Sequence, residues 1–297
     1  MTNQSKGLIA IFTACTIWGL SGLFFAQLDG VPVLEVLAHR TLWSAAFFCV
    51  ILALQGKLRV LTTLLLSRQM LTIAAATTCI TLNWFTYIWS IHNHHALEAS
   101  FGYYIFPLVS VMLGMVFLGE KMRRRQAIAV CLAALAVVYL GYSLGRPPWI
   151  PLILACSFGL YGLIKKRLNA EAIVTVTAEV ILLVPFSLAY ILGLEFGWFG
   201  LPAGSGLFGT GAKVSILLLA SAGMTAVPLM LFSFAAQRLR LGTVGLVQYL
   251  NPSLQLCVAL FVFAEPMTPG HMVALPIIWA ALALYSWPAR AQRISVA

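Results

Sequence analysis

The segment from Ile91 to Pro107, IHNHHALEASFGYYIFP, brings three histidines, a glutamate and two tyrosines together in one short stretch. Imidazoles and carboxylates at such close spacing serve as metal ligands or as acid–base groups in many proteins. In a membrane protein, polar residues between apolar runs also line the mouth of a solute pathway. The choice between a metal site, a catalytic cluster and a pathway depends on the elements that carry the segment.

The composition predicts a polytopic helical membrane protein, so the expected fold class is all-α. Of the 297 residues, 61% are hydrophobic and only 9% are charged, and the mean hydropathy is +0.96. Soluble domains carry about 25% charged residues. The apolar runs are repeatedly long enough for the ~20 helical residues that cross a bilayer core. The six cysteines lie in apolar segments without CxxC spacing, which indicates buried hydrophobic roles.

Ten transmembrane helices are predicted along the chain. Their expected ranges are 7–27, 33–54, 71–91, 97–118, 127–143, 149–164, 173–193, 214–235, 243–263 and 271–288. The first run lacks a good signal-peptide cleavage site, so it is interpreted as a transmembrane helix. Residues 56–70 and the glycine-rich residues 194–213 are too interrupted to span, and either segment is a candidate to lie along the membrane interface.

Positive charge predicts the orientation of these helices. Most basic residues fall on one side of the predicted membrane: Lys6, Lys57, Arg59, Arg68, Lys121, Arg123, Arg124, Arg125, Lys165, Lys166, Arg167, Arg238, Arg240, Arg290 and Arg293. Only Arg146 and Lys213 fall on the other side, and Arg40 lies within a helix. The positive-inside rule therefore places both termini in the cytoplasm. The net charge of +10 is explained by these basic residues on one side of the membrane, and no nucleic-acid partner is expected.

An internal repeat divides the chain into two halves. A shift of 145 residues places YYIFPLVSVMLGMVFLGEKM on QYLNPSLQLCVALFVFAEPM. The identical pairs are Tyr104 with Tyr249, Pro107 with Pro252, Glu120 with Glu265 and Met122 with Met267. Because each half holds five predicted helices, the second half enters the membrane from the opposite side. Residues 1–145 and 146–297 are thus predicted to be inverted five-helix repeats, an arrangement typical of secondary transporters.

Two polar helix faces, related by the repeat, are the candidate walls of a central cavity. The fourth helix carries Ser100, Tyr103, Tyr104, Pro107 and Ser110 on one side, and the ninth carries Gly245, Gln248, Tyr249, Pro252 and Gln255. The alternative is ordinary hydrogen bonding between neighbouring helices. The two prolines lie near the predicted midplane, where a missing N–H frees a carbonyl for substrate; the alternative is a purely structural kink.

The second and third predicted helices hold further candidates. Glu35, His39 and Trp43 share one face of the second helix, and Arg40 lies beside His39. We expect Arg40 to extend towards the interface or to pair with an acid, Glu35 or Glu98, either as a structural ion pair or as part of a substrate or proton site. The third helix carries a polar stripe that leads outward: Asn83, Tyr87, Ser90 and His94.

The two halves also place carboxylates at equivalent positions. Glu179 corresponds to Glu35 in the inverted repeat, which puts one carboxylate near each mouth of the pathway. No Walker A sequence, HExxH motif, nucleophile elbow or aspartate-rich metal cluster occurs in the chain. The expectation is therefore a non-enzyme without cofactor or metal, and His92, Asn93, His94 and His95 are interpreted as the outer turn of a pathway mouth.

The chain closely resembles the RarD group of the EamA family, within the drug/metabolite transporter superfamily. The resemblance runs from the first predicted helix to the last and is carried by LAHRTLWS, NWFTYIWSIHNHHALEASFGYYIFPLVSVMLGMVFLGEKMRRRQ and QRLRLGTVGLVQYLNPS. It implies ten helices in two inverted EamA repeats around a central cavity that moves small organic solutes across the bacterial inner membrane. Phe106 stands where the group usually has asparagine, whereas Asn251 keeps the asparagine in the second repeat, so the first half of the site is expected to be more apolar.

These observations lead to one hypothesis and one rival. The hypothesis is a secondary transporter that moves small metabolites or drug-like amphiphiles by alternating access, with protons as candidate coupling ions. Its expected substrate contacts are Tyr103, Tyr104, Gln248, Tyr249 and Asn251, and its expected outer gate or proton-linked cluster is Glu35, His39, Arg40 and Glu98. The rival is a membrane-embedded enzyme that acts on lipid or prenyl groups through the Glu35–His39–Arg40 cluster. Substrate identity, transport direction and oligomeric state stay open.

Overall fold

The computed structural model describes residues 2–119, 124–168, 170–200, 202–239 and 241–286, and these residues form helices without any strand. The α-helices are α1 (Asn3–Gly19), α2 (Ser21–Ala26), α3 (Val33–Leu54), α4 (Leu58–Leu65), α5 (Met70–His92), α6 (Ala96–Leu118), α7 (Arg124–Leu144), α8 (Trp149–Lys165), α9 (Ala172–Phe196), α10 (Ala212–Ala220), α11 (Gly223–Ala236), α12 (Leu241–Gln248), α13 (Leu250–Cys257) and α14 (Pro269–Ser286). A 3₁₀ turn, Trp198–Gly200, follows α9, and a π-helical segment, Val258–Val262, continues α13.

The apolar helices agree in position with the predicted spans. Within the described residues, nine helical segments are long and apolar enough to cross a bilayer, and α8 is an additional shorter apolar helix. The predicted boundary around GRPPW separates α7 from α8 as expected. The predicted interfacial segments contain the short helix α4 and the loop between α9 and α10.

Three of the spanning segments are interrupted, which the hydropathy pattern did not predict. The first breaks at Leu20 between α1 and α2, and another breaks between α10 and α11 at Ser221 and Ala222. The third breaks at Tyr249, between α12 and α13. Breaks of this kind redirect side chains within a span without altering its mean hydropathy, so an apolar window average cannot reveal them.

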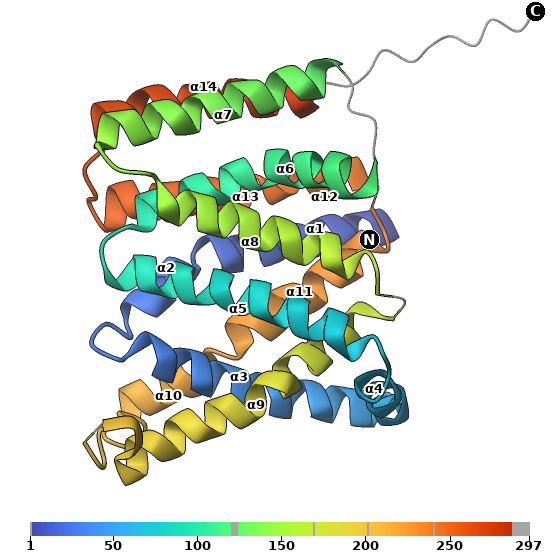
Figure 1. Ribbon diagram of the computed structural model, residues 1–297. Helices are drawn as coiled ribbons and strands as arrows, with labels where there is room; N and C mark the ends of the chain where they lie inside the picture. Colours follow the sequence, from blue (N-terminus) through green and yellow to red (C-terminus); the bar gives the residue numbers. More distant parts are fainter. Residues whose placement is uncertain (1, 120–123, 169, 201, 240, 287–297) are drawn as a thin grey trace, which may run out of the picture.

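The spanning helices lie across the view in Figure 1 and stack in layers, with α7 and α14 at the top and α3 and α9 near the bottom. The main packed pairs are α6 with α8, α5 with α8, α1 with α11, α1 with α13, α3 with α9, and α7 with α14. The start of α1 and the end of α14 lie on the same side of the bundle (Figure 1).

Close helix contacts depend on two glycines. A Cβ atom on Gly19 would lie 2.6 Å from the Leu254 Cβ and 3.1 Å from the Asn251 carbonyl oxygen. A Cβ atom on Gly102 would lie 2.8 Å from the Leu154 Cβ and 3.0 Å from the Pro151 carbonyl oxygen. Glycine therefore permits the close approach of α1 to α13 and of α6 to α8, as small residues do in membrane helix interfaces.

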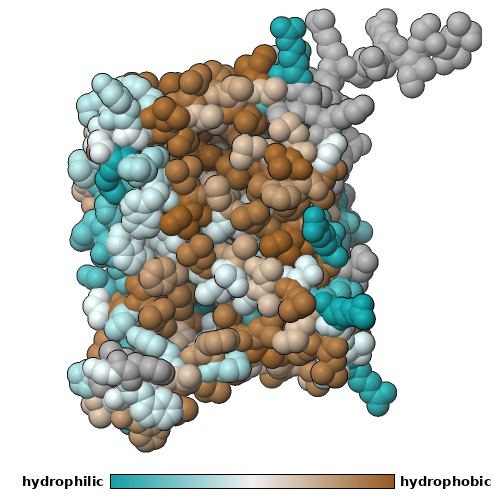
Figure 2. All heavy atoms as spheres, in the orientation of Figure 1, coloured by the Kyte–Doolittle hydropathy of each residue, from teal (hydrophilic) through white to brown (hydrophobic). Residues whose placement is uncertain are grey.

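The surface has the polarity of a protein that spans a bilayer. Figure 2 shows an apolar band across the middle of the molecule and polar residues at its left and right edges. Large apolar side chains are exposed around the bundle, among them Leu54, Phe186, Ile216 and Phe261. The spanning helices of Figure 1 cross this apolar band from one polar edge to the other. The membrane normal therefore runs along their long axes.

The two ends of the bundle differ in charge. One end, here called the basic end, carries the start of α1, the α3–α5 connection, the start of α7, the end of α8 and the end of α11. Its described basic residues are Lys6, Lys57, Arg59, Arg68, Arg124, Arg125, Lys165, Lys166, Arg167 and Arg238. The opposite end carries Arg146 and Lys213. Lys121, Arg123, Arg240, Arg290 and Arg293, together with the repeat positions Glu120 and Met122, lie outside the described residues.

Candidate substrate-binding site

Arg40 is the centre of a buried cluster that joins the two halves of the chain. Helix α3 places its side chain between α2, α5 and α11, where the residue is only 6% exposed. The Arg40 Nε donates a hydrogen bond of 2.6 Å to the Thr225 Oγ1. The guanidinium carbon lies 4.3 Å from the centre of the Trp84 ring and 5.7 Å from that of Phe25. The two aromatic rings thus stabilise the buried guanidinium through cation–π interactions.

The expected ion pair between Arg40 and an acid is wrong. Glu98 pairs instead with Arg146, at 2.7 Å, and with the His95 Nδ1, at 3.2 Å. Glu35 accepts hydrogen bonds from two backbone amides rather than from Arg40. The prediction failed because it compared only acids on neighbouring predicted helices, whereas these acids bind Arg146, Leu207 and Phe208, which lie far from them in the sequence.

A hydrogen-bonded network extends from this cluster across α5, α6 and α8. The Tyr103 hydroxyl donates to the Asn83 Oδ1 at 3.0 Å. Asn83 in turn donates from Nδ2 to the Leu154 carbonyl, at 3.0 Å, and to the Ser157 hydroxyl, at 3.1 Å. Asn83 is therefore fully engaged in holding α5 to α8, and Tyr103 is the network member nearest to Tyr87, with ring centres 5.8 Å apart.

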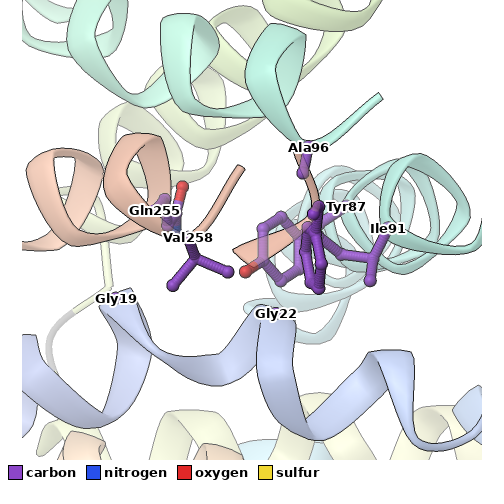
Figure 3. A pocket seen from close by; sticks show the side chains of 8 residues that line it. Gly19, Gly22, Tyr87, Ile91, Ala96, Gln255 and Val258 are labelled. Atoms are coloured by element: carbon purple, nitrogen blue, oxygen red, sulfur yellow. The ribbon is translucent and has the colours of Figure 1, made fainter. Parts of the chain in front are cut away.

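Tyr87 connects the Arg40 cluster with a small pocket. Its ring lies 6.2 Å from that of Phe25, and its hydroxyl is 2.9 Å from the Ser21 hydroxyl. The pocket is a narrow gap between helices, and Figure 3 shows Tyr87 entering it from α5 opposite Val258. Its lining residues are Gly19, Gly22, Tyr87, Ile91, Ala96, Gln255, Val258 and Phe263.

The second half contributes a polar side chain to this pocket. Gln255, on α13, donates from Nε2 to the Asn251 Oδ1 at 3.0 Å. The Gln255 Oε1 is buried and has no hydrogen-bond partner among the described residues. A buried amide oxygen without a donor is a binding group for a ligand N–H or O–H.

The predicted stripes do not each face a single cavity. Tyr104 forms a 2.8 Å hydrogen bond with Ser253, which joins α6 to α13, so it faces a different neighbour from Tyr103. Ser100 donates to the Leu97 carbonyl within its own helix. Pro107 lies inside the continuous helix α6, Pro252 is buried in α13, and Gln248 and Tyr249 are half-buried. Phe106, in the position of the usual asparagine, packs on Phe158 at a ring distance of 4.7 Å.

A carboxylate and an aromatic residue make the contacts between α3 and the loop that precedes α10. The Glu35 Oε1 accepts hydrogen bonds from the backbone N–H groups of Leu207, at 2.7 Å, and Phe208, at 3.1 Å. The Phe208 ring stacks on His39 with centres 4.6 Å apart and lies 6.2 Å from Trp43. Sequence reasoning identified Glu35, His39 and Trp43 but missed Phe208, because it lies in a glycine-rich loop without periodicity.

A second buried carboxylate lies towards the basic end. Glu179 is 2% exposed, and its Oε1 lies 2.6 Å from the Lys165 Nζ. Its Oε2 accepts a hydrogen bond of 3.1 Å from Tyr161. From the sequence, Lys165 is expected only to mark topology, because its pairing with Glu179, which joins α8 to α9, has no signature in the local sequence.

The histidine turn has structural contacts of its own. The His92 Nε2 is 3.0 Å from the Phe25 carbonyl oxygen, and His95 stacks on Trp89 at 5.7 Å. Throughout the described ranges, no group of three or more histidine, cysteine or acidic side chains is arranged to hold a metal ion. The turn is followed by α6, whose first amides are bound by Glu265: the Oε1 accepts from Ala96 N and the Oε2 from Leu97 N, both at 2.7 Å.

Comparison with known proteins agrees with this membrane architecture. The EamA-like transporter family matches residues 5–142. The chain is similar to a protein of Bacillus subtilis (strain 168) named "Uncharacterized transporter YojE", at 39% identity over 96% of this chain and 95% of the relative. It is also similar to "Protein RarD" of Streptomyces exfoliatus, at 41% identity over 97% and 90%, and to "Protein RarD" of Escherichia coli (strain K12), at 36% over 94% and 93%.

One solved structure, described as "Crystal structure of protein", superposes with a TM-score of 0.59 at 16% identity, covering 95% of this chain and 96% of that chain. At this level of identity the likeness concerns the fold alone. It extends over nearly the full length of both chains, so the arrangement of helices described above has a counterpart in a known structure.

Proposed function

Because this chain belongs to the RarD group of the EamA-like transporter family, we propose that it is a secondary transporter that moves small organic solutes by alternating access. That it is a membrane transporter follows from the family; the substrate class and the mechanism are proposed here. The observation that carries the proposal is the polar cluster around Arg40, which is buried at membrane depth and is built from α2, α3 and α5 of the first half and α11 of the second. Polar sites between two halves are where secondary transporters bind substrate.

The proposed architecture is ten transmembrane helices in two inverted repeats, residues 1–145 and 146–297. Its support is the symmetry of the helix contacts. Exchanging the halves converts the pair α6–α8 into α13–α1, α5–α8 into α11–α1, and α5–α9 into α11–α3, and all of these pairs are in contact. The pairs α3–α9, α7–α14 and α6–α13 each join equivalent helices. In this scheme α8 is the sixth span.

The proposed orientation places the basic end in the cytoplasm of a bacterium, with both termini there and the opposite end outside. The unequal distribution of lysine and arginine supports this orientation. The membrane is then the bacterial inner membrane, as expected for relatives that are named as transporters and come from bacteria.

The proposed gates lie at the two ends. On the outside, Glu35, His39 and Trp43 hold the loop of Phe208 over the Arg40 cluster, and Glu98 with Arg146 ties α6 to the turn before α8. On the inside, the pair of Glu179 and Lys165 ties α8 to α9. Tyr103, Tyr104, Gln248, Tyr249 and Asn251 are proposed to contact substrate during the cycle, with Tyr87 and Gln255 at the pocket between the gates.

Proton coupling is proposed to involve Glu35 or His39. The Glu35 Oε2 and the His39 Nδ1 are both buried, and neither has a hydrogen-bond partner among the described residues. Each atom can therefore accept a proton without breaking an existing contact. The variants Glu35→Gln and His39→Ala should alter the pH dependence of uptake, and unchanged profiles in both would remove these residues from coupling.

The decisive experiment is transport by purified protein in liposomes. A panel of organic acids, amines and neutral solutes is loaded, and exchange is followed by mass spectrometry. The proposal expects at least one solute to move faster than in protein-free liposomes. The rival enzyme function, turnover of lipid or prenyl groups, finds no support in the relatives; lipid turnover with no solute movement would establish it and overturn the proposal.

A further inference from the structure

The Arg40 guanidinium is a buried cation, and most of its donors have no hydrogen-bond acceptor among the described residues. Of its five N–H groups, the Nε–H is bound to Thr225, and no described residue accepts from the terminal nitrogens. The described carboxylates nearest to it in the sequence or at the same end, Glu35 and Glu98, are bound by other groups. Buried polar groups in proteins nearly always have partners, and a charge within a membrane is costly without one.

The surroundings of Arg40 suit an organic anion. Trp84 and Phe25 lie beside the guanidinium and supply apolar ring surfaces against which an aromatic or aliphatic body can pack. Arginine presents a planar fork of donors that matches a carboxylate in two parallel hydrogen bonds. Because the cluster holds one unpaired positive charge, a monoanion neutralises it, whereas a dianion would leave a net negative charge in a low-dielectric site.

We propose that Arg40 is the recognition residue for substrate and that the substrate is an amphipathic organic monoanion, whose carboxylate binds the guanidinium while its apolar body lies against Trp84 and Phe25. The proposal rests on the transport function proposed above and narrows its substrate class. Thr225, in the second half of the chain, accepts a hydrogen bond from the Arg40 Nε and so fixes the orientation of the guanidinium. The bound anion therefore lies between the two halves. Tyr87, which contacts Phe25 and also lines the pocket of Figure 3, continues the apolar surface towards that pocket.

The test compares matched acids and amides on the purified full-length protein. The probes are phenylacetate and phenylacetamide, hexanoate and hexanamide, and inorganic phosphate, each titrated at constant ionic strength with thermal stability as the readout. The expected result is that at least one carboxylate binds about tenfold or more tightly than its amide, since the charge-assisted pair is lost in the amide. Phosphate at the same concentrations should give no stabilisation.

Variants of Arg40 test whether this side chain causes the preference for acids over amides. Arg40→Gln should remove the difference between acid and amide, and Arg40→Lys should retain part of it because the charge stays but the fork is lost. Both variants should remain folded, because no ion pair is broken, and size-exclusion profiles check this. Arg59→Gln, which removes an exposed arginine of α4 outside the cluster, should retain the acid preference and is the matched control.

Three outcomes would overturn the inference: equal binding of acids and amides in every matched pair, retention of the preference in Arg40→Gln, or stabilisation by phosphate as strong as by the carboxylates. Flux measurements on the same protein distinguish failure of the monoanion proposal from failure of the proposed transport function. Movement of neutral solutes or amines without any acid preference contradicts only the monoanion class. Absence of movement for every solute contradicts the transport function itself.

Discussion

At the scale of single residues, Glu265 is the clearest structural contact between the two halves. Its two carboxylate oxygens each accept one backbone N–H at the start of α6, which satisfies donors that a helix cannot pair internally. In Glu265→Gln the side-chain amide nitrogen would face a backbone N–H, so one hydrogen bond is lost. We expect the variant to be less stable by about 1–3 kcal/mol, measured by unfolding in detergent.

Glu195→Gln is the matched control for this change. Glu195 is exposed at the end of α9, so the same loss of charge there should leave stability nearly unchanged. An unfolding transition of Glu265→Gln that coincides with those of the wild type and the control would contradict the structural role of Glu265.

The sequence identified several members of the Arg40 cluster but not their partners. Polar residues are costly to place in a membrane, so their residue types marked Arg40, Asn83, Tyr87 and Tyr103 as candidates. Thr225 could not be found in this way, since its distance of 185 positions from Arg40 leaves no local pattern. The same limit produced the wrong pairing of Arg40 with an acid.

At the scale of elements, the contact of α1 with α13 depends on Gly19. A methyl group at this position would lie 2.6 Å from the Leu254 Cβ, closer than any ordinary contact, so the two helices must separate. We expect Gly19→Ala to lower the stability by about 1–3 kcal/mol. Unfolding in detergent, followed by circular dichroism, measures the change.

Gly162→Ala in α8 is the control for the helix contact. No atom lies within 4 Å of the added Cβ, so the variant should be as stable as the wild type or gain about 0.5–1 kcal/mol from the higher helix propensity of alanine. If both alanine variants change stability equally, close packing at Gly19 is not the reason.

The loop of Leu207 and Phe208 is held by one side chain of α3. Both amides donate to the Glu35 Oε1, so Glu35→Ala should expose them to exchange with solvent. We expect hydrogen–deuterium exchange in the peptide around these residues to rise about tenfold, which corresponds to about 1.4 kcal/mol of lost protection. Glu195→Ala should leave the exchange unchanged, and equal exchange in wild type and Glu35→Ala would show that Glu35 does not hold the loop.

The positions of the apolar helices could be predicted because each needs a long apolar run, but their interruptions could not. Leu20 lies between Gly19 and Ser21, but α6 contains Gly102 and Ser110 without a break, so residue type alone does not mark the break between α1 and α2. The interruption depends on packing against helices that are remote in the sequence. Tyr249 shows the same limit, since the repeat matched it with Tyr104 in the continuous helix α6.

At the scale of the whole molecule, the proposed topology makes His94 and Arg59 accessible from opposite sides of the membrane. Both residues are exposed; His94 follows the end of α5, and Arg59 lies in α4, which precedes the start of α5. In a variant without native cysteines, His94→Cys should react with a membrane-impermeant maleimide in intact cells. Arg59→Cys should react only after the membrane is permeabilised. The reverse pattern would contradict the orientation derived from the basic end.

The all-helical membrane architecture was more predictable than any single contact, because composition and long apolar runs are properties of the whole chain. The inverted repeats stay a proposal, which the odd number of helices per repeat predicts and the symmetric helix contacts support. In the proposed mechanism, the exchange of contacts that opens one end and closes the other depends on small differences in free energy between packed states. Those differences leave no trace in residue types.

Alternating access is tested most directly by linking the outer gate shut. In a cysteine-free background, His39→Cys and Phe208→Cys place two thiols where the rings now stack, and a short reducible bis-methanethiosulfonate reagent joins them. The account predicts that linked protein in liposomes loses most of the solute uptake that the unlinked double variant shows, and that reduction restores it, while the reagent leaves uptake by each single-cysteine variant unchanged. Uptake at the unlinked rate by fully linked protein would contradict it.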